Sequence, residues 1–375
     1  MRVLVTRGPN LLTPEAGDWA TLRVFLESKF NTSSNPEPRT LTQLPYFLGW
    51  LKQAIINLYQ EGGRFTPSQV LILCGSAGVG KNVLQDIITA LLGGRKADPF
   101  SHMEGGTSFN GELVEVEHWM VADQQSSTKH ADKQRLKACI KQTAVNATMH
   151  VNAKFGKPIN IECYRRLTIS LNDHPEALRV LPSLSRDLED KLMILQVLPG
   201  LQFGDNQSFG SYQQWWTAIK SELPAFVHYI LTGHTIDRDH GDQRYGIKSY
   251  KNPEILRIIA DESQEVRFLE MIDQCVFQAR NTEWVGTSHE LFRELYSPST
   301  AKELEIIGCT GSVKVGHLLG KLLTARPDRF PNAGLVSGIR RYRIFPPQAP
   351  CPIIDDGGIV ARSFTGGNQV ISPEV

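Results

Sequence analysis

The chain has 375 residues, of which 41% are hydrophobic and 21% charged, an ordinary globular composition with enough apolar side chains for a sizeable core. Its 40 Lys and Arg residues almost balance 39 Asp and Glu residues, so the net charge of +1 neither indicates nor excludes a nucleic-acid partner. The six cysteines are scattered without a C-x-x-C pair, which argues against a zinc site and favours reduced thiols in a cytoplasmic protein. No signal-peptide pattern and no apolar run of roughly 18 residues are found, so no membrane partner is expected.

Residues 1–64 are expected to form an N-terminal arm followed by a helical segment. The first residues, to about 40, show little hydrophobic periodicity and include a stretch rich in Pro, Ser and Asn at 31–39. Apolar residues then recur at spacings of three and four, at Leu48, Leu51, Ile55 and Leu58. This spacing predicts an amphipathic helix that ends at Gly62-Gly63.

Residues 65–200 alternate between strand and helix patterns. Short apolar runs predict buried strands at 69–74, 119–122, 167–171 and 192–195, and apolar residues at helical spacing predict helices at 83–92 and 134–145. A bend at Gly156-Lys157-Pro158 predicts a β-hairpin over 149–161. The alternation predicts an α/β fold in which a parallel sheet carries helices on both faces.

The rest of the chain divides into three parts. Residues 201–282 follow a helical pattern, at 212–231 and again at 253–280. Residues 283–345 are expected to form a small winged-helix-like domain, with short helices at 288–296 and 313–325 and a basic strand at 337–345. Its basic residues are candidates for phosphate contacts, with an oligomerisation or packing module as the alternative: Lys314, Lys321, Arg340, Arg341 and Arg343. Residues 346–375, rich in Pro, Gly and Ser, are expected to be a disordered tail.

A glycine-rich loop is the strongest motif in the sequence. It has the spacing G-x-x-x-x-G-K and consists of Gly75, Ser76, Ala77, Gly78, Val79, Gly80, Lys81 and Asn82. It follows a predicted buried strand and opens a predicted helix, which is the context that a phosphate-binding loop requires. Backbone N–H groups and Lys81 would then bind the phosphates of ATP, whereas the alternative is a coincidental glycine-rich turn.

Asn82 stands where such loops normally carry a Ser or Thr that binds Mg²⁺. Its amide oxygen can take that role directly or through water, or the metal site is weakened. Asp123 ends a predicted strand in the Walker B arrangement, as a second candidate for Mg²⁺, with a turn or cap as the alternative. Gln124 occupies the position of the usual general base and can orient a water but cannot take its proton. Asn172 ends the next strand and is a candidate γ-phosphate sensor, or part of an Asn-Asp turn.

A basic segment lies between Asp123 and Asn172, and its predicted hairpin carries Lys154 and Lys157. A lysine-tipped hairpin that projects into a ring channel would contact the phosphates of single-stranded DNA. The alternative is a solvated charged face.

The ordered set of these segments resembles superfamily 3 helicases, and within them the helicase domain of phage and mobile-element primase–helicase proteins. The resembling segments cover about 45–200 and include LLGGRKA at 91–97, TSFNGEL at 107–113, EHWMVADQ at 117–124 and RRLTISLND at 165–173. The resemblance implies that Lys81 binds phosphate, Asp123 binds metal, Asn172 acts as a sensor and Lys154 touches DNA. It also implies a basic residue that reaches the ATP of a neighbouring subunit, for which Arg186 and Lys191 are the candidates. The alternative for Asp190-Lys191 is an ordinary surface ion pair.

The expected function is therefore that of an ATP-dependent DNA helicase or translocase on single-stranded DNA in phage or mobile-element replication. The resemblance implies a homo-hexameric ring that uses ATP and Mg²⁺, with a possible separate primase as partner. The alternative is a catalytically weakened DNA-binding and assembly module that recruits a primase. A packaging ATPase or a small-molecule kinase is a third possibility, and the basic segment argues against the kinase.

Overall fold

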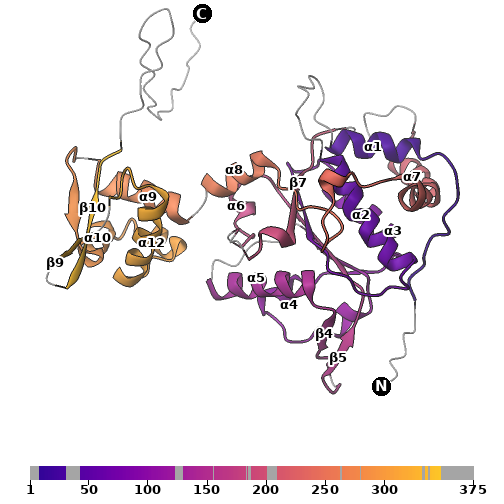
Figure 1. Cartoon of the computed structure of the whole chain (residues 1–375), viewed down its shortest axis with the longest axis horizontal. Helices are drawn as coiled ribbons and strands as arrows, with labels where there is room; N and C mark the ends of the chain where they lie inside the picture. Colours follow the sequence, from indigo (N-terminus) through magenta and orange to yellow (C-terminus); the bar gives the residue numbers. More distant parts are fainter. Residues whose placement is uncertain are drawn as a thin grey trace, which may run out of the picture. The chain divides into compact units, whose positions relative to one another are not determined.

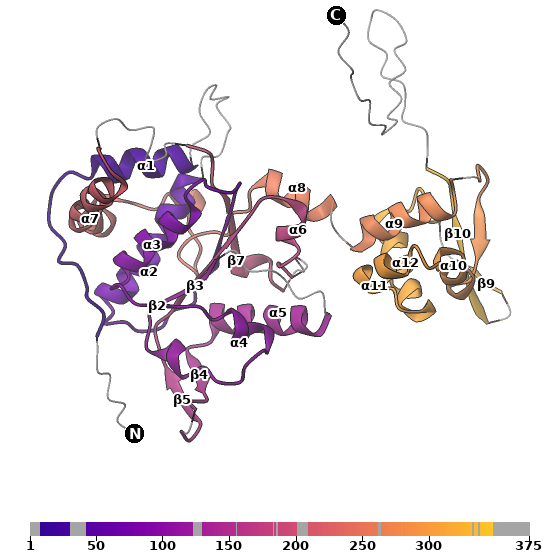
Figure 2. The ribbon, with the colours of Figure 1, turned by 180° about the vertical axis from the view of Figure 1, so that it is seen from behind.

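The computed structural model describes residues 8–30, 43–122, 130–154, 156–182, 184, 187–200, 209–261, 264–278, 280–331, 334–336 and 338–347. The chain divides into two compact units, Met1–Ser263 and Gln264–Val375 (Figures 1 and 2). None of the helices within the described ranges is long and apolar enough to cross a membrane.

A five-stranded parallel sheet forms the centre of the first unit, as predicted (Figure 1). The strand order is β2 (Lys96–Ala97), β3 (His118–Ala122), β6 (Arg166–Leu171), β1 (Val70–Cys74) and β7 (Leu192–Gln196). All residues of β1 and β6 are buried, because parallel sheets are covered on both faces. The predicted strands and the α/β class are thus confirmed.

Helices cover the two faces of this sheet and form two separate cores. On one face, α1 (Ala20–Phe30), α2 (Leu44–Tyr59), α3 (Lys81–Leu91) and α7 (Tyr212–His228) pack against Leu71 and Leu73. On the other, α4 (Phe100–Glu104), α5 (His130–Val145), α6 (Pro175–Leu178) and α8 (Pro253–Asp261) pack against Val70 and Ile72. The two pairs alternate along β1, because successive side chains of a strand point to opposite faces.

Helix α1 differs from the expected N-terminal arm. Leu22, Leu26 and Phe30 are at most 1% exposed and pack in the same core as α2 and α7. The residues at 31–39 that were expected to continue the arm lie outside the described part of the chain. Helix α7 continues into a π-helical turn, η4 (Tyr229–Gly233), and the short 3₁₀ turns η1 (Gly111–Val114), η2 (Glu189–Lys191) and η5 (Arg238–His240) connect other elements.

The predicted hairpin is present as the antiparallel pair β4 (Thr148–Val151) and β5 (Ile159–Glu162), in which Met149 pairs with Ile161. It projects from the body of the first unit, away from the five-stranded sheet (Figures 1 and 2).

The second unit combines helices with a small antiparallel sheet, and its assignment as a winged-helix-like domain stays a prediction. Its elements are α9 (Gln264–Cys275), β8 (Trp284–Gly286), α10 (Ser288–Leu295), α11 (Ala301–Ile307), α12 (Ser312–Ala325), β9 (Gly334–Val336) and β10 (Ile339–Ile344). The three strands form an antiparallel sheet in the order β8-β10-β9. The division at 263/264 precedes the boundary expected at 283, because Phe268 and Ile272 of α9 pack in one core with Leu291 and Leu319.

A buried histidine joins the sheet of the first unit to α3. His118 is fully buried, with Nδ1 2.7 Å from Thr89 Oγ1 and Nε2 2.8 Å from Thr168 Oγ1. Burial, with a smaller effect of the positive charge on Lys96, lowers the pKa of His118 to about 3. The ring is therefore neutral in the folded protein at every pH at which the protein would normally be studied.

We expect this histidine to make the first unit sensitive to acid. In the unfolded chain a histidine titrates near pH 6.5, so between about pH 6.5 and 3 the unfolded state binds a proton that the folded state does not. The contribution of the neutral His118 ring to the free energy of unfolding is fully present above about pH 6.5. Below that pH it is lost, at up to about 1.4 kcal/mol per pH unit. Urea unfolding of wild type and His118→Gln between pH 7.5 and 5 should show a shallower pH dependence in the variant. The exposed His150→Gln serves as control, and parallel wild-type and His118→Gln curves would contradict this expectation.

Candidate functional site

The glycine-rich loop runs from the carboxyl end of β1 to the first residue of α3, as its motif predicted. A side chain on Gly75 would place its Cβ 2.4 Å from the carbonyl oxygen of Val197, so only glycine fits there. Gly78 and Gly80 have φ angles of +80° and +96°, which other residues rarely adopt. Each of the three glycines is therefore required by the backbone, which turns sharply between strand and helix at this point.

Lys81 folds back over this loop and meets the end of β6. It is 5% exposed, and its Nζ donates to the carbonyl oxygens of Gly75 at 2.7 Å and Ser76 at 2.9 Å. The same Nζ donates to Asn172 Oδ1 at 2.9 Å. Two candidates that are far apart in the sequence are thus brought together at the carboxyl edge of the sheet.

The residue after Asn172 also belongs to this group, although the sequence indicated no role for it beyond a turn. Ser76 Oγ donates to Asp173 Oδ2 at 3.1 Å. Gly75 N donates to the carbonyl oxygen of Leu171 at 3.2 Å, so the loop is bonded to the end of β6 through backbone and side chains. The only sequence signal for Asp173 was the run of polar residues directly after a buried strand.

Asn82, the residue in the Ser/Thr position, is exposed and faces β6. Ser170 Oγ lies 3.4 Å from Asn82 Oδ1, to which it donates. Ser170 is also the register partner of Ala122, the last residue of β3. The predicted residues Asp123 and Gln124 come next in the chain and lie outside the described residues, so the roles of all three in metal and water binding stay predictions.

Helix α1 brings a second lysine to the loop. A Cβ on Gly80 would lie 3.5 Å from Lys29 Cε, 3.9 Å from Lys29 Nζ and 3.8 Å from Phe25 Cζ. Lys29 is 1% exposed, and its Nζ lies 5.4 Å from the centroid of the Phe25 ring. The sequence interpretation missed this contact because it treated the segment as an arm, although Leu22, Phe25 and Leu26 have helical spacing.

The Asp190-Lys191 pair lies at the opposite edge of the sheet from the loop. Leu192, which follows the pair, is the register partner of Val70 at the start of β1, whereas the loop follows Cys74 at its end. Four residues of strand separate these positions by roughly 13 Å. Lys191 is therefore placed far from the glycine-rich loop of its own chain, and Arg186 lies outside the described residues.

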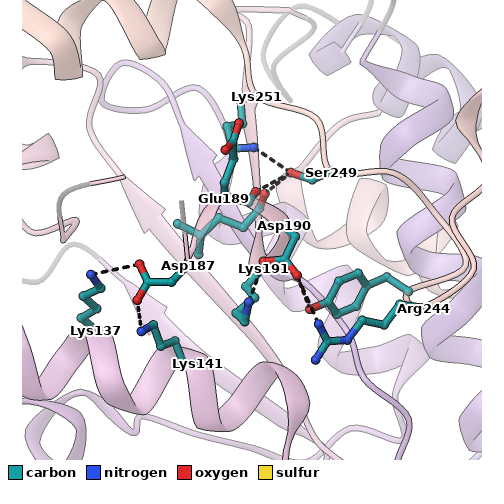
Figure 3. A network of polar contacts seen from close by, with 11 residues as sticks. Lys137, Lys141, Asp187, Glu189, Asp190, Lys191, Arg244, Ser249 and Lys251 are labelled. Carbon is teal, nitrogen blue, oxygen red and sulfur yellow. Dashed lines mark hydrogen bonds and ion pairs between the residues drawn. The ribbon is translucent and has the colours of Figure 1, made fainter. Parts of the chain in front are cut away.

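Three groups contact the Asp190 carboxylate (Figure 3). Lys191 Nζ is 2.6 Å from Oδ1, while Arg244 Nη1 is 3.4 Å and the Tyr245 hydroxyl 3.1 Å from Oδ2. The Lys191 side chain is only 14% exposed, whereas that of Arg244 is 53% exposed. The sequence interpretation missed Arg244 and Tyr245, since nothing in the sequence connects them to Asp190 across the intervening chain.

The contacts in this cluster shift the pKa values of Asp190 and Tyr245 in opposite directions. Partial burial alone would raise the pKa of Asp190, but hydrogen bonds from Lys191 and Tyr245 and the Lys191 charge hold it below its usual range. Burial, together with the Asp190 charge, raises the pKa of Tyr245. At neutral pH the tyrosine therefore remains a hydrogen-bond donor to an ionised carboxylate.

The basic segment divides into charges that are paired within the unit and charges on the hairpin. Lys137 Nζ is 3.2 Å from Asp187, and Lys141 forms an ion pair with the same carboxylate (Figure 3). Lys154 and Lys157 are exposed in the loop between β4 and β5. The hairpin thus presents the two lysines that the sequence singled out, and their contact with DNA stays a prediction.

Charge in the second unit is unevenly distributed along its chain. Residues 264–311 contain eight acidic and four basic residues, whereas 312–347, which include α12, β9 and β10, contain one acidic and seven basic residues. Five of these seven basic residues lie on α12 and β10, although Lys321 and Arg343 pair with Glu265 and Glu283 of the same unit. A contact of this unit with DNA remains a prediction.

Comparison with known proteins supports the fold. The model of a family of unknown function, DUF5906, matches residues 73–186. The apo structure of the NrS-1 C-terminal region (305–718) superposes with a TM-score of 0.50 at 14% identity, covering 90% of this chain and 77% of that one. The chain shares the fold of that region. The A form of the NrS-1 region gives a TM-score of 0.49 at 14% identity, with 90% and 78% covered.

A structure of the JCV helicase gives a TM-score of 0.37 at 12% identity, covering 67% of this chain and 61% of that one. No curated protein matches the chain.

Proposed function

We propose that the chain is an ATP-dependent translocase or helicase that acts on single-stranded DNA as a ring of identical subunits. The observation that carries this proposal is the meeting of Lys81 with Asn172 over the glycine-rich loop. A lysine of a G-x-x-x-x-G-K loop and a polar side chain from the neighbouring strand end are the two groups that such enzymes direct at a terminal phosphate.

In this proposal the loop residues bind the phosphates of ATP. The loop backbone and the positive end of α3 attract the phosphate oxygens. In this proposal Lys81 exchanges the carbonyl oxygens of Gly75 and Ser76 for phosphate oxygens, and Asn172, which accepts a hydrogen bond from Lys81, orients the attacking water. Asn82 and Asp123 are the residues proposed to hold Mg²⁺, which when bound neutralises charge on the phosphates.

The opposite edge of the sheet would serve the ATP of the next subunit. Lys191 and Arg244 cannot reach the glycine-rich loop of their own chain, because the full length of β1 lies between that loop and Asp190. The side chain of Arg244 is more exposed than that of Lys191. Its present partner is the Asp190 carboxylate, which the phosphates of a bound ATP could replace. We therefore add Arg244 to Arg186 and Lys191 as a residue that stabilises charge developing on the γ-phosphate.

The competing function is that of a DNA-binding assembly module with weakened hydrolysis, which recruits a primase. Gln124 favours it, because a neutral amide has no useful basicity near pH 7. Steady-state ATP hydrolysis with and without single-stranded DNA separates the two functions, since only the translocase turns over ATP faster when DNA is present.

Lys81→Ala should abolish ATP binding. The variant removes the cation that the loop places at the phosphates, and charge-assisted hydrogen bonds of this kind are each equivalent to roughly 10- to 100-fold in affinity. A fluorescent-nucleotide titration measures the effect, with Lys96→Ala as control because Lys96 is an exposed lysine paired with Asp86. Unchanged affinity in Lys81→Ala would sink the assignment of the loop to nucleotide binding.

Arg244→Ala should retain ATP affinity but lose DNA-stimulated hydrolysis, by roughly 10³-fold if it acts as a trans-acting arginine. Mixing it with Lys81→Ala should restore activity, because about a quarter of the interfaces in random rings would pair an intact loop with an intact Arg244. Arg257→Ala, which removes a 72% exposed arginine on α8, is the matched control. A mixture as inactive as the two separate variants would show that Arg244 does not act across subunits.

Lys154→Ala should weaken binding to single-stranded DNA and leave ATP affinity intact. A lost phosphate contact lowers the slope of log affinity against log salt by roughly 0.7 to 1. Fluorescence anisotropy of a labelled oligonucleotide at several salt concentrations measures the slope. Lys220→Ala, which removes an exposed lysine on α7, is the control. If Lys154→Ala had the same affinity and the same salt slope as wild type, the hairpin would be excluded as a DNA contact.

A further inference from the structure

An open cavity of about 400 Å³ lies beside the base of the β4–β5 hairpin. Helix α5, strand β4 and the loop that precedes η1 contribute its walls. Apolar atoms make up most of the exposed lining, but many lining residues carry hydrogen-bonding side chains, among them Ser108, Gln142, Asn146 and Asn152, and none of the described residues that line it is acidic. Its volume is at the lower end of the range for small-ligand sites, so it suits one small group, and the hydrogen-bonding side chains with no carboxylate among them favour an uncharged or anionic one.

An arginine and a tryptophan contribute to this lining from below the surface. Arg165 and Trp119 are 4% and 3% exposed, and the guanidinium carbon lies 5.7 Å from the tryptophan ring centroid. Arg165 donates through Nη1 to the carbonyl oxygen of Cys163 at 3.3 Å and through Nη2 to that of Asn146. Its Nε is buried without a hydrogen-bond partner among the described residues. Buried polar atoms normally have a partner, so this donor is an exception among the residues that line the cavity.

The cavity is tied to the lysines of the hairpin. Asn152 and Pro158 line it, and these two residues flank the hairpin loop that carries Lys154 and Lys157. Asn110, 4% exposed, fixes this geometry, since its Nδ2 donates to the carbonyl oxygen of His150 at 2.9 Å and its Oδ1 accepts from Asn152 N at 2.7 Å. A strand whose phosphates contact these lysines therefore passes the cavity mouth.

We propose that this cavity binds one unstacked nucleobase of the DNA single strand held by the hairpin. The proposal rests on the proposed function, because it requires the hairpin to contact DNA. Side-chain amides match the donor and acceptor edges of a base. The absence of acidic lining residues removes the repulsion that a carboxylate would exert on the adjoining phosphates.

The test compares two labelled single strands of equal length on the full chain, one with normal bases and one with abasic positions in its central part. Both have the same phosphate backbone and differ in their bases, so the variant of the cavity lining shows whether the difference arises at the cavity. Wild type should bind the abasic strand about tenfold more weakly. Gln142→Ala/Asn146→Ala, which changes two exposed side chains of the lining, should bind both strands with the abasic-strand affinity of wild type.

Gln134→Ala, another exposed glutamine of α5, is the control and should keep the wild-type difference. Equal wild-type affinity for the two strands would overturn the base-binding proposal while leaving DNA binding by the hairpin intact. A variant that loses affinity for both strands in equal proportion would also overturn it, because the lining would then act on the backbone. If wild type binds neither strand, the proposed function itself fails, which distinguishes that failure from failure of the cavity proposal.

Discussion

The hydrogen bond between Lys81 and Asn172 depends on the register of two buried strands, and the candidate site depends on that bond. Strands β1 and β6 run parallel, with Cys74 opposite Leu171, so the residues that follow them leave the sheet side by side. A shift of one residue in this register would turn the side chains of β6 to the opposite core. The two cores on the faces of the sheet prevent such a shift, because each alternate residue of β1 is packed against a different set of helices.

The two edges of this sheet have different chemistry. The carboxyl edge carries the glycine-rich loop, Lys81 and Asn172, while the amino edge of β7 carries Asp190 with Lys191 and Arg244. A subunit that needs both sets of groups around one phosphate can bring them together only by using two copies of the chain. In this way a parallel sheet, whose strand ends are chemically distinct, supports the proposal of a ring with shared sites.

The hairpin is an insertion that the same unit holds in a defined position. Asn110 bonds to both sides of the β4 end, and this buried amide fixes where Lys154 and the cavity lie relative to each other. Two lysines of the surrounding segment have a different role, because Lys137 and Lys141 bind Asp187 within the unit. A count of positive charge along this segment therefore overstates the charge that is available to a partner.

Much of the fold could be predicted from the sequence, because the information is local. The apolar runs of the strands, the glycine spacing of the loop, the hairpin bend, and two helices and the last strand of the second unit all follow from residues close together in the chain. Helix α1 was missed although its spacing was visible, since a neighbouring stretch rich in Pro, Ser and Asn suggested an arm. The unit boundary was placed too late for a different reason: α9 has the same helical pattern whichever core it joins, and only packing against Leu291 and Leu319 decides that it belongs to the second unit.

The candidate site divides in the same way. The sequence by itself identified Lys81, Asn172 and the hairpin lysines as candidates, because each occupies a position defined by its distance from a strand end or a bend. Only the tertiary structure decided that Lys29 of α1 lies against Gly80, that Asp173 bonds to Ser76, and that Arg244 and Tyr245 share the carboxylate of Asp190. These contacts join segments separated by tens of residues or more. They follow from strand order and packing, which no local pattern in the chain records.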